Sequence, residues 1–240
     1  MSPLTPRRPA PPRPVGRWFF DRPVLAVAEA LIGCHLVRRG PGRALRVARI
    51  VETEAYGGVG VDPSAHSYKG PTPRCESMFG PPGTAYVYAT QGACHCLNVS
   101  VEGDDSGRAV LLRAAEPVEG VELMRLRRLD RLSEGPTKKR LAAGHEDELA
   151  QGPGRLCICL DVDRRLDAMD LTDWGSSLYV ASGEPEPRVL WTRRIGLNDG
   201  SASYAWRWRA LHPESPAVSR ASRAEVGEPV PGPDPAVPPG

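Results

Sequence analysis

Proline and glycine constrain this chain more than any other feature, because neither residue favours the interior of a helix or of a central strand. Among 240 residues there are 26 prolines and 25 glycines. Residues 1–17 hold six prolines, four arginines and no acid, and residues 213–240 hold eight prolines and little that could enter a core. Such segments bury too little apolar surface to offset the entropy of ordering. We therefore predict a disordered basic arm over 1–17, a disordered tail over 220–240, and one domain over 18–219.

The charge of the chain is nearly balanced, with a net charge of +2 and 25 bases against 25 acids in residues 18–212. Any affinity for nucleic acid must therefore come from local patches, such as the bases gathered between residues 125 and 140. The hydrophobic content of 40% is enough for a core. No run of eighteen apolar residues and no secretory signal occurs. We expect a cytoplasmic protein without membrane contact.

Six cysteines lie at positions 34, 75, 94, 96, 157 and 159. Without a secretory signal they indicate reduced thiols rather than a disulfide framework. Two Cys-x-Cys pairs occur, at 94–96 and 157–159, and on strands each pair would point to one face and could offer thiolates to zinc. Free cysteine is also a common small core residue. We predict no metal site and keep a zinc protein as an alternative.

The first elements have clear sequence signals. Asp21 as a cap, Pro23 in the first turn and Gly33 as a stop predict a helix over the apolar run 24–32. Residues 46–56 alternate as a strand does, which places Glu54 and Tyr56 on one face. Residues 57–83 form a long loop rich in Gly and Pro, a length that is usually functional.

The remaining elements are shorter. We predict strands over 84–89, 94–101, 109–113, 156–160, 177–181 and 188–195, and a helix opened by Pro117 and running to about Leu132. Strands outnumber helices and no regular βαβ rhythm occurs. The sequence therefore predicts a single α+β domain around a mostly antiparallel, curved sheet with a protruding hairpin.

Common catalytic motifs are missing: the sequence has no GxxxxGK[ST], HExxH, GxSxG or GxGxxG element. Phosphate-loop, zinc-protease and α/β-hydrolase (GxSxG) functions therefore lose their support. Polar and aromatic residues instead gather between positions 52 and 113, at Glu52, Glu54, Tyr56, His66, Tyr86, Tyr88, Asn98 and Arg113.

Nine ordered segments carry a resemblance to a known family. They read RIVETEAY (49–56), AHS (65–67), TPR (72–74), MF (78–79), PGTAYVY (82–88), CLN (96–98), LLRAAEP (111–117), GPGRL (152–156) and RIGL (194–197). In this order they resemble the alkyladenine (3-methyladenine) DNA glycosylase family, over roughly residues 18–219. The resemblance implies a monofunctional hydrolase of base excision repair. Such an enzyme flips alkylated or deaminated purines out of double-stranded DNA and hydrolyses their N-glycosidic bond.

The resemblance also implies the catalytic residues. Glu54 matches the general base that deprotonates water for attack on C1′ of the deoxyribose, and a carboxylate ionised at working pH suits this task. Arg113 matches the arginine that holds Glu54 and the water, and its cation favours the ionised carboxylate. The backbone of Ile195 is expected to complete the water site. Glu52 matches a non-catalytic position, and no cofactor and no lysine nucleophile are implied.

The base pocket follows from the same resemblance. Tyr56, His66 and Tyr88 are expected to sandwich the flipped base, and Asn98 to exclude normal guanine by crowding its 2-amino group. Tyr86 is interpreted as a core aromatic, one residue out of phase. The hairpin tip departs from the family pattern, since Gln91 occupies the position of the usual aromatic DNA wedge.

Two alternatives from other classes stay open beside the repair enzyme. One is a non-catalytic module that binds damaged nucleic acid, which the altered wedge would suit, although Glu54 and Arg113 argue against it. The other is the zinc protein built on the Cys-x-Cys pairs. We expect a monomer in the cytoplasm, associated with the nucleoid, whose partner is double-stranded DNA with a damaged purine.

Overall fold

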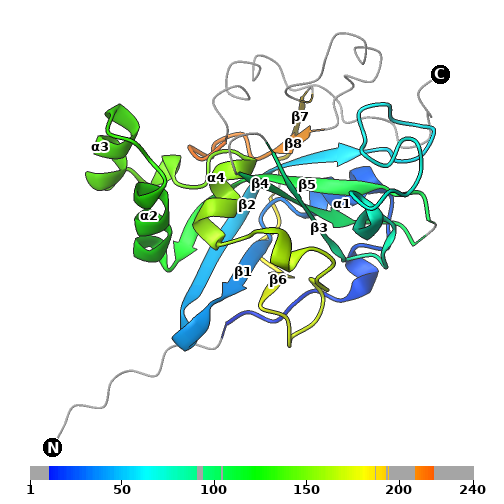
Figure 1. Ribbon diagram of the computed structural model, residues 1–240, viewed down its shortest axis with the longest axis horizontal. Helices are drawn as coiled ribbons and strands as arrows, with labels where there is room; N and C mark the ends of the chain where they lie inside the picture. The colour runs from blue at the N-terminus through cyan, green and yellow to red at the C-terminus, as the bar shows by residue number, and fades with distance from the viewer. Residues whose placement is uncertain are drawn as a thin grey trace, which may run out of the picture.

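A computed structural model describes residues 11–90, 94–103, 105–186, 188–192, 194 and 209–218. Within these residues a sheet of eight strands forms the centre of the molecule (Figure 1). The strands are β1 (His35–Arg39), β2 (Leu45–Tyr56), β3 (Ala85–Ala89), β4 (His95–Ser100), β5 (Ala109–Glu119), β6 (Leu178–Ala181), β7 (Leu190–Thr192) and β8 (Arg209–Leu211). The helices are α1 (Val24–Ala30), α2 (Val121–Asp130), α3 (Pro136–Ala142) and α4 (Pro153–Leu160).

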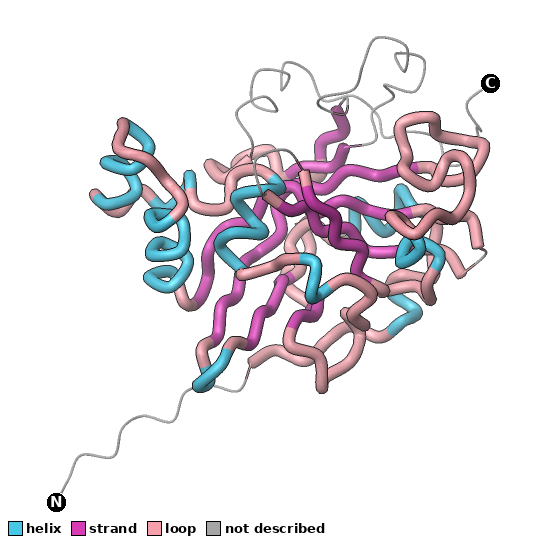
Figure 2. The backbone as a smooth tube through the Cα atoms, in the orientation of Figure 1, coloured by secondary structure: helices cyan, strands magenta, loops and turns pink. Residues whose placement is uncertain are grey.

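The sheet is antiparallel at every pairing, in the order β3-β4-β5-β2-β1-β6, with β8 pairing both β2 and β7. Its strands form one curled layer, and α2 and α3 stand together at one side of it (Figure 2). This architecture confirms the predicted α+β fold around a curved antiparallel sheet. The long loop over 57–83 is ordered and contains a 3-10 turn at Glu76–Phe79.

The two faces of the sheet have different contents. Alternate residues of the strands bury their side chains in the main hydrophobic core together with α1 and α4; they include Val87, Leu97, Val99, Val110 and Leu112. Thr53 belongs to this face, where its hydroxyl donates to the Ala28 carbonyl of α1 at 2.8 Å. Because successive side chains of a strand point to opposite faces, the residues between these positions face away from α1.

Helix α1 lies where the sequence predicts it, but its cap is different. The Val24 N–H donates to Oε1 of Glu102 at 2.6 Å, whereas Asp21 accepts from the Gly103 N–H at 3.2 Å. The prediction of Asp21 as the cap is therefore wrong, because a carboxylate from the distant β4–β5 connection occupies the helix N-terminus. Gly33 follows the helix with φ of +89°, as expected of its stop residue.

Two predicted elements are wrong. No helix opens at Pro117, because β5 continues to Glu119, where Glu116 pairs with Arg49 of β2, and α2 begins only after Gly120. Pro117 is tolerated where the register shifts between Val47 and Ala48 of β2.

The predicted strand over 156–160 is helix α4, which Pro153 opens and whose apolar side chains are buried. A short apolar run does not distinguish a buried strand from a buried helix. Helix α3 has no counterpart among the elements predicted from the sequence.

The ends of the chain lie largely outside the described residues. Within the predicted arm, Pro14 bridges Ala181 and the Val15 N–H donates to the Val180 carbonyl at 2.9 Å, so these two residues lie along β6. Arg17 pairs with Asp170, outside β6, at 2.6 Å. We propose that the arm ends before Pro14. Within the described part of the chain, none of the helices has the length and apolar character needed to cross a bilayer.

Gly33 provides a test of this packing. A Cβ on this residue would lie 2.2 Å from the Glu184 carbonyl oxygen, while a Cβ on Gly42, whose φ is also positive at 62°, would meet nothing within 4 Å. We expect Gly33→Ala to lower the free energy of unfolding by about 2 to 5 kcal/mol, through backbone strain plus overpacking. The control Gly42→Ala should cost only the strain, about 1 to 2 kcal/mol. Urea denaturation measures both, and equal losses would contradict this account.

Candidate active site

The register of the sheet brings predicted site residues into one row. Tyr86 of β3 lies opposite Asn98 of β4, Asn98 lies opposite Leu111 of β5, and Leu111 lies opposite Glu54 of β2. Directly opposed residues place their side chains on the same face. Tyr86, Asn98 and Glu54 therefore share the face that points away from α1, and Tyr88 and Arg113 join them by alternation along β3 and β5.

Glu54 is held from two sides. It is fully buried, at 0% exposure. Its Oε1 accepts from the Tyr56 hydroxyl at 2.6 Å, and its Oε2 accepts from Nη1 of Arg113 at 3.2 Å. The shared face of Glu54 and Tyr56 is thus confirmed, and Glu54, Tyr56 and Arg113 lie together.

Arg113 joins two carboxylates. Its Nε donates to Oε1 of Glu52 at 3.2 Å while Nη1 reaches Glu54. Burial alone lowers the pKa of Arg113, but the charges of Glu54 and Glu52 outweigh it and raise that pKa above its ordinary value. Arg113 is therefore a permanent cation, and two buried carboxylates share its charge.

Tyr56 stays a neutral donor in this arrangement. Burial raises the pKa of its hydroxyl well above the ordinary value, and the neighbouring Glu54 charge raises it further. The hydroxyl proton consequently remains on Tyr56 and points at the carboxylate, which fixes the orientation of Glu54.

Three aromatic rings cluster beside the carboxylate. The rings of His66 and Tyr88 meet edge to face with centroids 4.6 Å apart, and Tyr86 stacks on Tyr88 at 5.3 Å. Nδ1 of His66 lies 2.8 Å from the Tyr86 hydroxyl. Burial raises the pKa of Tyr86 to about 12, so this hydroxyl also keeps its proton.

Tyr86 corrects the sequence interpretation. Its side chain is buried as a core residue would be, at 1% exposure. The phase argument is wrong, however, because positions 86 and 88 are two apart and share one face of β3. Tyr86 therefore belongs to the aromatic cluster, and the alternation of the strand could have shown it.

Asn98 is buried beneath this cluster at 3% exposure. Its amide Nδ2 donates to the Tyr86 carbonyl at 3.2 Å. This hydrogen bond restrains the orientation of the Asn98 amide.

Three further residues that the sequence did not single out adjoin the site. The Cζ of Arg74 lies 5.7 Å from the centre of the Tyr88 ring, and its Nη2 lies 3.5 Å from Nε2 of His66. Arg194 and Asp62 form a fully buried ion pair next to Tyr56. Arg74 and Arg194 do fall within the segments of family resemblance, and these segments could have pointed to both residues. Gln91 and Ile195 lie outside the described residues.

One of the two Cys-x-Cys pairs does not match the shared-face argument. Cys157 and Cys159 lie on helix α4, where positions two apart point in different directions, so their predicted strand placement is wrong. Burial raises the pKa of Cys159 to about 12 and that of Cys157 well above its ordinary value, so both thiols are protonated. No cluster of three or more His, Cys, Asp or Glu side chains suited to a metal ion occurs in the described ranges.

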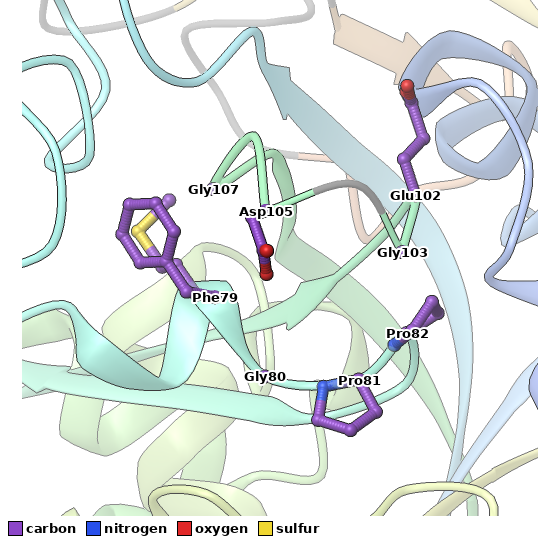
Figure 3. Close-up of a pocket in the computed structure, with 9 residues that line it drawn as sticks. Phe79, Gly80, Pro81, Pro82, Glu102, Gly103, Asp105 and Gly107 are labelled. Atoms are coloured by element: carbon purple, nitrogen blue, oxygen red, sulfur yellow. The ribbon is translucent and has the colours of Figure 1, made fainter.

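A separate pocket of about 300 Å³ lies between the segment that begins at Met78 and the β4–β5 connection (Figure 3). Its wall contains Phe79, Pro81, Pro82 and Asp105, together with Glu102. The Glu102 carboxylate already caps α1 and pairs with Arg108. The predicted site residues lie elsewhere, so we do not assign this pocket to the reaction.

Comparisons with known proteins show which family the whole chain resembles. The family model for methylpurine-DNA glycosylase matches residues 18–214. A Streptomyces avermitilis protein assigned as a 3-methyladenine DNA glycosylase is 43% identical over 203 residues, which cover 83% of this chain and 89% of the relative. A similarly assigned Alkaliphilus oremlandii protein is 39% identical over 206 residues, covering 85% and 98%. A third, from Carboxydothermus hydrogenoformans, is 43% identical over 187 residues, covering 77% and 88%.

The protonation of His66 can be tested directly. Burial of the ring, and then the cation of Arg74, lower the pKa of His66 below its ordinary value. In Arg74→Gln that pKa should rise part of the way back, because only the repulsion is removed and the burial remains. An NMR titration of the His66 ring protons measures it. Lys69→Gln, which removes an exposed cation of the same loop, is the control, and an unchanged His66 pKa in Arg74→Gln would contradict the assignment.

Proposed function

The chain belongs to the methylpurine-DNA glycosylase family, and from this premise we propose that it releases alkylated purines, 3-methyladenine among them, from double-stranded DNA in base excision repair. One observation carries the proposal. The Glu54 carboxylate is held between the Tyr56 hydroxyl and the Arg113 guanidinium, at 2.6 and 3.2 Å. A buried carboxylate with both oxygens oriented suits the activation of a single water.

The bond-breaking step uses these residues as follows. A water oxygen attacks C1′ of the deoxyribose while the bond from C1′ to the purine nitrogen breaks, and its electron pair leaves with the base. Glu54 accepts the proton that the water loses. A 3-alkylated adenine is already cationic, so it departs as a neutral base without prior protonation. Arg113 keeps the carboxylate in place, and we propose that the backbone of Ile195 contacts the same water.

The base must leave the duplex before this step. A stacked base is out of reach of a buried carboxylate, so the nucleotide has to flip into the pocket. We propose that Tyr56 stacks on one side of the base and that His66 and Tyr88 contact the other. Stacking on aromatic side chains is worth about 1 to 3 kcal/mol per base. The faces of Tyr56 and Tyr88 are also electron-rich and favour a cationic purine over a neutral one.

Asn98 contributes selectivity by exclusion. Its amide is fixed by the Tyr86 carbonyl, 3.2 Å from Nδ2, and is buried. A fixed group cannot move aside for the 2-amino group of normal guanine, whereas adenine has no such group. Rejection by a rigid wall needs no favourable contact to the correct base.

The neighbouring features support this reaction over the alternatives. A paired-acid mechanism needs two independent carboxyl groups, yet Arg113 binds Glu52 and Glu54 together. The alternative of a zinc protein requires both Cys-x-Cys pairs to lie on strands, and one of the two pairs lies on helix α4. A non-catalytic module would have no use for a carboxylate oriented by two donors.

We also propose the setting of the reaction. The partner is double-stranded DNA that carries a damaged purine, and one protein molecule suffices because a single pocket holds one flipped base. We place the activity in the cytoplasm, at the nucleoid. The proposed step needs only Glu54, Arg113 and water, so no cofactor is assigned.

Replacing the proposed base tests the function. Glu54→Gln preserves the shape of the side chain but cannot accept a proton, so single-turnover release of 3-methyladenine should fall by at least about 10²-fold while binding of the damaged duplex persists. Glu116→Gln changes a carboxylate of β5 that pairs with Arg49 away from the site, and it should leave the rate unchanged. Excision by Glu54→Gln within about tenfold of the unmodified chain would contradict the assignment.

The proposed wedge can be tested by restoring an aromatic ring. When a nucleotide flips, its neighbours lose stacking, and an inserted tyrosine recovers part of it. Gln91→Tyr should therefore bind a duplex with an abasic-site analogue more tightly, by up to about tenfold, or roughly 1.4 kcal/mol. Affinity for undamaged duplex at the same salt concentration should change much less. Equal changes on both duplexes, or none, would mean that another residue fills the gap.

A further inference from the structure

Arg194 and Asp62 form a buried ion pair that the proposed reaction does not use. Nη1 and Nη2 of Arg194 donate to the two carboxylate oxygens of Asp62, at 2.5 and 2.9 Å. Both side chains have 0% exposure. Burying two charges is costly unless their geometry is good, and the loss of one partner leaves an uncompensated charge. Backbone groups that are hydrogen-bonded to this ion pair are therefore held in position.

Asp62 connects the end of β2 to the loop that carries His66. Its Oδ2 accepts from the Gly57 N–H at 2.9 Å, directly after Tyr56, and its Oδ1 accepts from the Ser64 N–H at 3.1 Å. The Ala65 N–H donates to the Asp62 carbonyl at 2.9 Å. The carboxylate thus sets the position of both walls of the proposed base pocket, one on the strand and one on the loop.

Arg194 contacts the last residues of β2 directly. Nη1 donates to the carbonyl of Ala55, the residue between Glu54 and Tyr56, at 3.3 Å. Its Cζ lies 4.9 Å from the centre of the Tyr56 ring. A guanidinium over an aromatic face at this distance is attractive and holds the ring. Tyr56 in turn donates to Glu54 at 2.6 Å, so the contact extends to the proposed base.

We infer that Asp62 and Arg194 are positioning residues for the excision step, an inference that rests on the proposed function. Their ion pair holds the Tyr56 ring and backbone, and through the Tyr56 hydroxyl it holds the Glu54 carboxylate in the orientation that accepts the proton of water. The same pair fixes the approach of His66. We assign neither residue a direct part in bond breaking. Arg194 also directly precedes Ile195 in the sequence.

A double-mutant cycle on the single-turnover excision rate tests this inference. Arg194→Gln should slow release of 3-methyladenine by roughly 10- to 100-fold, as small misplacements of catalytic groups do. If the effect passes through the Tyr56 hydroxyl, the same substitution in a Tyr56→Phe background should cost less than about threefold, because the link to Glu54 is already broken. Asp62→Asn should behave like Arg194→Gln, and Arg194→Lys, which keeps the charge, should recover part of the rate.

The control breaks an ion pair on the same strand outside the site. Arg49 of β2 donates to Glu116 at 2.6 Å, five positions before Glu54, and Arg49→Gln should keep the rate within about threefold. Thermal unfolding of every variant separates loss of fold from loss of rate, and Arg194→Lys carries the comparison if Arg194→Gln does not fold.

The outcomes distinguish this inference from the function on which it rests. Wild-type rates in folded Arg194→Gln and Asp62→Asn, or additive effects with Tyr56→Phe, would overturn the inference and leave the glycosylase intact. Absence of excision by the unmodified chain would overturn both.

Discussion

The salt bridges of Arg113 to Glu52 and Glu54 are the interaction on which the centre of this molecule depends. Two carboxylates in the interior of the longest strand would be prohibitively costly without a cation. Arg113 reaches both at 3.2 Å in the stretch where β5 pairs with β2 through register shifts between Ile50 and Thr53. Bulges of this kind re-aim side chains beside active sites. The irregular pairing thus accompanies the burial of the proposed catalytic carboxylate in the core.

Most of the proposed site stands on this rigid frame. Tyr88, Asn98, Arg113 and Glu54 come from four adjacent strands, whose opposite face packs into the main core with α1. Groups fixed in advance need no reorganisation when charge develops in the reaction. His66 is the exception, since it lies on the long loop. The contacts of Asp62 bring the start of that loop under similar control.

The sequence predicted those features that depend on residues close together in the chain. Alternation gave β2 with Glu54 and Tyr56 on one face, and the proline and glycine signals gave α1 and its end. The sequence could not reveal the cap from Glu102 or the pair of Asp62 with Arg194, because these partners lie 78 and 132 positions apart and meet only in the folded sheet. The prediction of a strand over 156–160, where α4 lies, is wrong for another reason: five apolar residues fit a buried strand and a buried helix equally well. The catalytic roles came from family resemblance rather than from any local pattern.

The proposed pocket and the hairpin that we expect to carry the wedge make different demands on the fold. Glu54, Asn98 and Arg113 are buried and hydrogen-bonded, so a substitution at any of them disturbs the core as well as the proposed chemistry. The hairpin is closed before its tip, where the Thr90 N–H donates to the Cys94 carbonyl at 2.8 Å. Beyond this closure, β3 and β4 pair over five described positions, from Ala85 opposite Val99 to Ala89 opposite His95. We propose that glutamine at position 91 replaces an aromatic wedge without cost to the pocket, so that the strength of base flipping changes independently of the bond-breaking step.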